Sequence, residues 1–260
     1  MTTSETRFCA AVLLVASLAA SARADDRIDL RWTLAEGDVF ALSIDSERES
    51  RMMTAKDPIV TKFRMKVAAD LKIDSIGPDG TAAVTLEFRT FTGVIAAFGF
   101  ETPLDPEQSD VSGKSVTGTL TPRGDLKLDR KALKGVVEAH DISEEFGALF
   151  PVVPGEGVSV ETGWAATVED REEEWAVLGS SDGAVKLAGT CRADKQGDLG
   201  ETKTSYVAKG TMSASVSLDG GHPTQVAVEW TEDSRLIGKD SRLETGMTLK
   251  RTVEVAKKPR

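Results

Sequence analysis

Cysteine and histidine are both scarce in this chain of 260 residues, with two of each. Cys9 lies in an apolar stretch near the N-terminus, so a chain that loses this stretch keeps Cys191 alone and forms no internal disulfide. His140 and His222 belong to no catalytic or metal-binding motif. We therefore expect no disulfide scaffold, no metal site and no bound cofactor, and a fold that is held by its hydrophobic core.

The sequence also lacks an apolar run long enough to cross a membrane as a helix. Its longest run, Phe8–Ala20, follows Arg7 and ends among small residues, whereas a transmembrane helix needs about 20 apolar residues. This order predicts a secretory signal peptide over residues 1–24, with cleavage after Ala24 or, alternatively, after Ala22. We expect the protein to be exported to a periplasmic or extracellular location.

The chain also has no excess of basic residues. The chain has 32 Lys and Arg against 42 Asp and Glu, which gives a formal net charge of −10. An acidic surface repels phosphate backbones, so nucleic acid is not an expected partner.

The clearest pattern in the sequence is an alternation of apolar and polar residues over 62–91. Every second residue is apolar in the two runs 63–73 and 82–88, and the segment 77–80 between them has the Gly-Pro-Asp-Gly composition of a turn. Because successive side chains of a strand point to opposite faces, the pattern predicts a long antiparallel hairpin with one buried face. That face needs another layer to cover it.

Helical spacing occurs only in residues 129–150. Asp129 is a candidate N-cap for a first helix, and Asp141 or Ser143 for a second. The apolar positions that would face inward are Leu133, Val136, Val137, Ile142, Phe146, Leu149 and Phe150. Prolines in 151–154 end the segment. The pattern predicts a helical insert between two β halves.

The residues with catalytic potential fit structural roles better. Cys191 lies in phase with the apolar positions of its strand, which favours a core position. His140 ends the apolar stripe of the first expected helix, and His222 stands beside a proline in an expected solvated turn. The acidic run 169–174 lacks the ligand spacing of a calcium loop, which favours a solvated turn or edge. We assign no catalytic residue.

Several short features together resemble an uncharacterised family of secreted bacterial β-rich proteins. These features are Gly37-Asp38 before an aromatic strand, the turn Gly77–Gly80, the glycines Gly118 and Gly124, the prolines Pro151–Pro154, and Gly163-Trp164. The resemblance covers nearly the whole mature chain and is one of spacing. In the family the glycine stands further from the tryptophan than Gly163 does from Trp164. The resemblance implies a secreted β-rich fold, and it implies no active site.

The sequence predicts a mainly β protein with one domain over residues 25–256. We expect a large curved antiparallel sheet or half-barrel that carries the helical insert 129–150, and the alternative is a two-sheet β-sandwich. Residues 257–260 are expected to form a loose basic tail.

This architecture favours a non-catalytic exported module that binds a small apolar, lipid-like molecule or an envelope protein. The alternatives are a purely structural or surface-interaction module and a carboxylate-dependent hydrolase, for which no residues can be named. The expected ligand site lies between the insert and the hairpin. Its lining residues would be Met65, Val67, Leu133, Val137 and Phe146.

Overall fold

A computed structural model describes residues 27–54, 57–138, 140–143, 145–159, 163–168, 171–199, 202–237 and 242–259. In this part of the chain, one antiparallel sheet of 12 strands has the order β6-β5-β3-β2-β1-β12-β11-β10-β9-β8-β7, with β4 also paired to β3. The strands are β1 (Val39–Met52), β2 (Ile59–Ile76), β3 (Ala82–Ala97), β4 (Phe100–Pro103), β5 (Ser115–Leu120), β6 (Leu126–Leu128), β7 (Trp164–Val168), β8 (Arg171–Ser181), β9 (Ala184–Leu199), β10 (Thr202–Ser217), β11 (Pro223–Ile237) and β12 (Arg242–Lys257). The sheet is strongly curved and not closed, so the predicted mainly β, half-barrel fold is confirmed.

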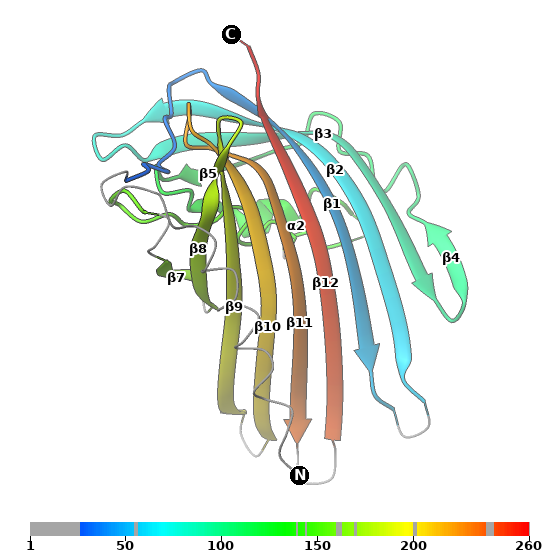
Figure 1. Ribbon diagram of the computed structural model, residues 1–260. Coiled ribbons are helices and arrows are strands. Elements are labelled where there is room, and N and C mark those ends of the chain that lie inside the picture. The colour runs from blue at the N-terminus through cyan, green and yellow to red at the C-terminus, as the bar shows by residue number, and fades with distance from the viewer. Residues whose placement is uncertain are drawn as a thin grey trace, which may run out of the picture.

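The chain starts in the middle of this sheet and returns to it at the end. β1 pairs with β2 on one side and with the last strand, β12, on the other. From β1 the strands proceed outward to the edge at β6, and from the opposite edge at β7 they return inward to β12. The segment between the two edges therefore crosses one face of the sheet, and Figure 1 shows it inside the curve. We call this face concave.

The predicted hairpin is β2 and β3. Its inward side chains from Phe63 to Ile73 and from Ala82 to Phe88 belong to the buried core. The turn between the strands is closed by the amide of Gly77, which donates to the carbonyl of Thr81 at 2.8 Å. The alternation of the sequence thus predicted the buried face correctly, whereas the pairing register shifts at two irregularities, between Ala68 and Ala69 and between Ile73 and Ser75.

The insert, which we define as residues 129–150, contains less helix than expected. α2 (Arg130–Lys134) is the first expected helix, and Asp129 caps it by accepting the amides of Lys131 and Ala132. No helix among the described residues is long and apolar enough to cross a membrane.

The second expected helix is wrong, because the described residues of 141–150 form turns. Arg251 of β12 donates to the carbonyls of Glu145 and Ala148, which a helix would use internally. Ala148 also has a φ of 45°, outside the helical region. The expected apolar stripe is nevertheless buried from Ile142 to Phe150.

The segment before β1 packs onto the same concave face. Trp32 contacts the rings of Phe40 and Phe150 at centroid distances of 5.3 and 5.1 Å. The backbone carbonyl of the neighbouring Arg31 lies so close to Gly221 that a Cβ atom on residue 221 would collide with it. Gly221 also has a φ of 63°, which favours glycine. This end of the half-barrel is therefore filled by protein.

The predicted loose tail is wrong as far as Lys258. β12 continues to Lys257, whose Nζ donates to the buried carboxylate of Asp38 at 2.7 Å. The next lysine, Lys258, lies 2.7 Å from the buried carboxylate of Asp70. Buried carboxylates need such partners, so the basic end is tied to the centre of the sheet.

Candidate functional site

The concave face has two halves that differ in what covers them. The covered half lies under the insert and holds the apolar inward residues of β1 from Phe40 to Ile44 and of β12 at Val253 and Val255. The open half lies beyond Ser46 of β1 and Arg251 of β12, toward the ends where β1 meets β2 and β11 meets β12. In Figure 1 these strand ends extend past the insert.

All five residues of the predicted ligand site belong to the hydrophobic core of the covered half. These are Met65, Val67, Leu133, Val137 and Phe146, and none is more than 4% exposed. The ring of Phe146 packs on that of Phe88 with a centroid distance of 5.6 Å. At these positions the insert lies directly on the sheet, and side chains fill the space that the prediction gave to a ligand.

Leu133 and Phe146 also line a cavity of about 530 Å³ at the gap between the two sheet edges. Leu126 and Leu128 of β6 stand on one side of this cavity and Val168 of β7 on the other. The insert forms its floor, so this cavity marks the place where the sheet fails to close.

A charged cluster marks the boundary between the covered and open halves. Glu145 of the insert is 1% exposed and accepts the hydroxyl of Ser46 at 2.9 Å, and its second oxygen lies 3.6 Å from Nη1 of Arg48. Arg251 donates Nη1 to the carbonyl of Glu145 at 2.7 Å and Nη2 to that of Ala148 at 2.9 Å. Burial lowers the pKa of Arg251 to about 10, so this guanidinium stays charged at neutral pH.

A second part of the cluster comes from β8. Arg171 donates Nε and Nη2 to the buried carboxylate of Glu173, at 3.1 and 2.6 Å, and its guanidinium lies 5.2 Å from the ring centroid of Trp230. The other oxygen of Glu173 accepts the indole N–H of Trp175. The expectation that this acidic run is a solvated turn or edge is therefore wrong at Glu173, because a strand turns every second residue inward. Residues 169 and 170 lie outside the described part.

Next to this cluster, the concave face contains a cavity of about 340 Å³. Its apolar wall consists of Tyr206, Val228, Trp230, Met247 and Leu249, and its charged lining of Arg48, Arg130, Glu145, Arg171, Glu232 and Arg251. Leu243 and Leu236, which pair across β12 and β11, continue the same inward register into the open half and are 37% and 38% exposed. We call this inward row the apolar track; Thr245 and Ser234 interrupt it, and its inner end meets charged residues of both signs.

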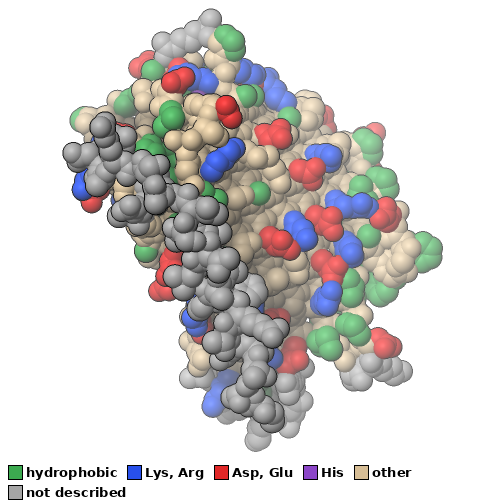
Figure 2. Space-filling model, viewed as in Figure 1, with side chains coloured by type: hydrophobic (Ala, Val, Ile, Leu, Met, Phe, Trp, Pro, Cys, Tyr) green, Lys and Arg blue, Asp and Glu red, His purple; other side chains and the backbone are tan. Residues whose placement is uncertain are grey.

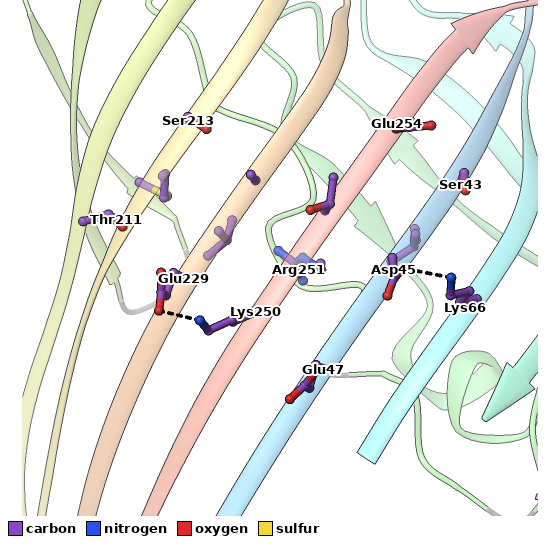
Figure 3. A pocket seen from close by; sticks show the side chains of 15 residues that line it. Ser43, Asp45, Glu47, Lys66, Thr211, Ser213, Glu229, Lys250, Arg251 and Glu254 are labelled. Atoms are coloured by element: carbon purple, nitrogen blue, oxygen red, sulfur yellow. Dashed lines mark ion pairs between the residues drawn. The ribbon is translucent and has the colours of Figure 1, made fainter. Parts of the chain in front are cut away.

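A larger hollow, about 810 Å³, lies on the opposite face of the sheet. Figure 3 shows its exposed pairs, Lys66 with Asp45 and Lys250 with Glu229, each at 3.1 Å, and Figure 2 shows charges of both signs over this face. Paired surface charges and small polar residues are typical of the solvated side of an antiparallel sheet. We therefore place the candidate site on the concave face, where guanidinium groups are shielded from water.

Cysteine and histidine take structural positions. Cys191 is 3% exposed, as predicted, and burial raises the pKa of its thiol to about 11. The prediction of a solvated His222 is wrong: the ring is half-buried against Trp32 and Phe40, and burial, with the charge of Lys257 added, lowers its pKa. The ring of His140 packs against that of Phe63 in a tilted arrangement, with a centroid distance of 3.9 Å. The described residues contain no cluster of three metal-ligating side chains.

The sequence reasoning missed the three arginines of the cluster. Arg48 and Arg251 stand in the apolar register of β1 and β12, and Arg171 stands in the inward register of β8. A charged residue at an inward position of an alternating strand was the available signal, because such a residue is rarely buried without a partner.

No family model and no curated protein matches the sequence. Among solved structures, the chain is similar to one reported as "Lipid-protein interactions in lipovitellin", with a TM-score of 0.45 and 10% identity over 85% of this chain and 25% of that chain. It is also similar to an outer membrane channel from Pseudomonas putida F1, with a TM-score of 0.26 and 8% identity over 91% of this chain and 100% of that chain. At such low scores, neither likeness carries an argument about this protein.

Proposed function

We propose that this protein is a non-catalytic binding protein for a small molecule with a long apolar part, held on the open half of the concave face. The observation that carries the proposal is the cavity at the edge of the insert, where a wall of five apolar side chains meets six charged residues. Ligand pockets are typically concave, mostly apolar sites of about 300–1,000 Å³ with a small number of placed polar groups. This cavity lies near the lower end of that range.

The apolar track beyond the cavity extends the surface available to a ligand. Leu249, Met247, Thr245 and Leu243 follow one another on the inward side of β12, and Leu236 of β11 stands opposite Leu243. Leu243 stands six positions before Leu249, a span of about 20 Å at about 3.4 Å per residue. A ligand chain along this track removes apolar surface from water, at about 25 cal/mol per Å². An elongated apolar molecule suits the track better than a compact polar one.

The charged residues of the cavity support binding over hydrolysis. A general acid or base must reach the substrate, but Glu145 is 1% exposed and is engaged by Ser46 and Arg48. Glu232 accepts the hydroxyl of Tyr206 at 3.2 Å. Both carboxylates therefore already interact with neighbouring side chains.

We also propose that the protein acts outside the cytoplasm, as a member of the uncharacterised secreted family that its sequence resembles. This part of the proposal is supported by the sequence of residues 1–24 and by the spacing of the family features.

Native mass spectrometry of the protein, purified from its own compartment, tests the proposal together with uptake of a fluorescent fatty acid. We expect a bound lipid-sized mass and saturable uptake. Met247→Glu is expected to weaken uptake at least about tenfold, because it places a charge beside the apolar chain. Thr248→Glu, the same change on the opposite face of β12, is the matched control and is expected to bind normally.

Two outcomes contradict the proposal. Absence of a bound mass together with absence of uptake eliminates the ligand and leaves a structural or surface-interaction module. Equal binding by the Met247 and Thr248 variants places any ligand off the concave face. Melting temperatures of both variants show whether each remains folded.

A further inference from the structure

Seven exposed hydrophobic side chains lie along one end of the half-barrel, which we call the open end. Strand pairing brings the turns β1–β2, β3–β4 and β11–β12 to this end of the sheet. Figure 2 shows hydrophobic side chains around β4 and the ends of β1 and β2. The seven side chains are between 37% and 78% exposed: Met52, Met53, Phe98, Phe100, Leu236, Ile237 and Leu243. Apolar side chains that are exposed together mark an interaction site for a protein or a membrane.

The turn between β3 and β4 carries the two most exposed of these side chains. Ala97 pairs with Phe100, so Phe98 and Gly99 form a two-residue turn, with φ values of 53° and 81°. Positive φ at both positions is typical of a type I′ turn, for which Asn-Gly is a favoured sequence. A bulky side chain is unfavourable at positive φ, and Phe98 is 78% exposed, so burial does not offset that cost. The fold itself therefore does not favour a phenylalanine at this position.

This turn projects from the molecule on an anchored hairpin. A Cβ atom on Gly99 would meet no heavy atom within 4 Å beyond its chain neighbours, and Phe100 is 76% exposed. Behind the turn, the amide of Leu104 donates to the carbonyl of Gly93 at 2.8 Å. Because β4 is held on β3 in this way, the two phenylalanine rings lose little conformational freedom when they enter an apolar environment.

The charged side chains behind the turns pair with one another. Arg64 of β2 lies 2.5 Å from Glu101 of β4, and Arg235 of β11 lies 3.4 Å from Glu244 of β12. Charges of both signs are therefore neighbours at the open end, in a chain whose net charge is −10. Anionic lipids attract polybasic segments, whereas neighbouring charges of both signs suit zwitterionic headgroups.

We propose that the open end docks on the surface of a lipid bilayer with zwitterionic headgroups, and that Phe98 and Phe100 enter the headgroup layer. Apolar side chains bind such a layer in proportion to the apolar area that they bury there. Hydrophobic side chains on three separate turns fit a fluid lipid surface. A protein partner would instead have to present a complementary surface of about 800 Å² to the same turns.

The apolar track supports a bilayer as the occupant. The track runs from Leu249 to Leu243, and Leu243 is itself one of the seven side chains of the open end. Docking therefore brings the outer end of the track to the lipid, so that an apolar ligand passes between them without crossing water. The docking goes beyond the proposed function and does not require a ligand, because the exposed turns carry it.

Co-sedimentation of the unmodified protein with phosphatidylcholine vesicles tests the docking. We expect the protein to bind these vesicles and to stay bound at high salt, because burial of apolar side chains is not screened by ions. Adding phosphatidylglycerol to the vesicles is not expected to strengthen binding, since the chain is acidic.

A double variant locates the contact. Phe98→Asn together with Phe100→Thr is expected to lower the vesicle partition coefficient at least about tenfold. Asparagine is favoured at this position of the turn, so the melting temperature is expected to stay equal or to rise, and unfolding does not explain the loss. Leu178→Thr together with Leu218→Thr is the matched control. These two side chains are 57% and 43% exposed near the opposite end of the sheet, and their loss is expected to leave vesicle binding unchanged.

Each contrary result overturns the docking. The first is an unmodified protein that takes up a fluorescent fatty acid but does not bind phosphatidylcholine vesicles, which leaves the proposed function standing. The second is binding that requires phosphatidylglycerol and is lost at high salt, which assigns the contact to charge. The third is equal vesicle binding by the unmodified protein and the Phe98/Phe100 variant. The fourth is a dimer in solution that the same variant dissociates, without vesicle binding, which assigns the open end to a second copy of the chain.

Discussion

The covered and open halves of the concave face are built from the same strands but differ in what their inward side chains do. On β12, Val253 and Val255 are buried beneath the insert, whereas Leu249 and Met247, in the same register, are only half-buried. On β1 the inward residues change from Ile44 to Ser46 where the cover ends. A curved sheet therefore forms a core only where another segment covers it, and beyond that point the same alternation leaves apolar side chains partly exposed.

The covered half is expected to be the more sensitive to charge. Val67→Asp buries an unpaired carboxylate in the core and is expected to lower the free energy of unfolding by about 4 kcal/mol. Lys66→Asp, one residue along on the outer face, is the control and is expected to cost less than about 1 kcal/mol. Urea denaturation measures both. Equal losses would contradict the assigned register of β2.

The boundary between the halves depends on Glu145. Glu145→Ala removes a carboxylate that faces both Arg48 and Arg251, and is expected to lower the free energy of unfolding by about 3 kcal/mol. Glu47→Ala, at an exposed position of β1 between Ser46 and Arg48, is the matched control with an expected loss below about 0.5 kcal/mol. A cost for Glu145→Ala as small as that of the control would mean that the insert is held by apolar packing alone.

The smallest expected effect is a pH dependence at His222 in the covered half. Burial lowers the pKa of this imidazole, so the folded state binds fewer protons than the unfolded state below the ordinary value of 6.5. The free energy of unfolding is expected to fall as the pH drops from 6.5 toward the folded-state pKa of His222. Below that pKa, His222 is expected to cause no further loss. Thermal melts from pH 8 to about 5 measure the loss, and His222→Gln is expected to reduce it. Asp38 and Lys257 face the ring, so Lys257→Met serves as a second comparison. An unchanged slope in His222→Gln would assign the dependence to another group.

The sequence by itself determined the β class, the buried face of β2 and β3 and the cap at Asp129, because each follows from local spacing and from residue types with fixed backbone preferences. It also placed Met65, Val67, Leu133, Val137 and Phe146 together, since all five are apolar residues of inward registers. It did not determine that all five are buried in the core.

Only the tertiary structure decided where the open site lies. Glu145 meets Arg48 and Arg251 across 97 and 106 positions of sequence, and Arg171 reaches the same cavity from the far half of the sheet. The prediction of the second helix was wrong because of another long-range contact: Arg251, on a strand distant in the sequence, donates hydrogen bonds to the carbonyls of Glu145 and Ala148. Alternation and capping act between neighbours in the chain, whereas the balance of buried charges depends on which strands the curvature of the sheet brings together.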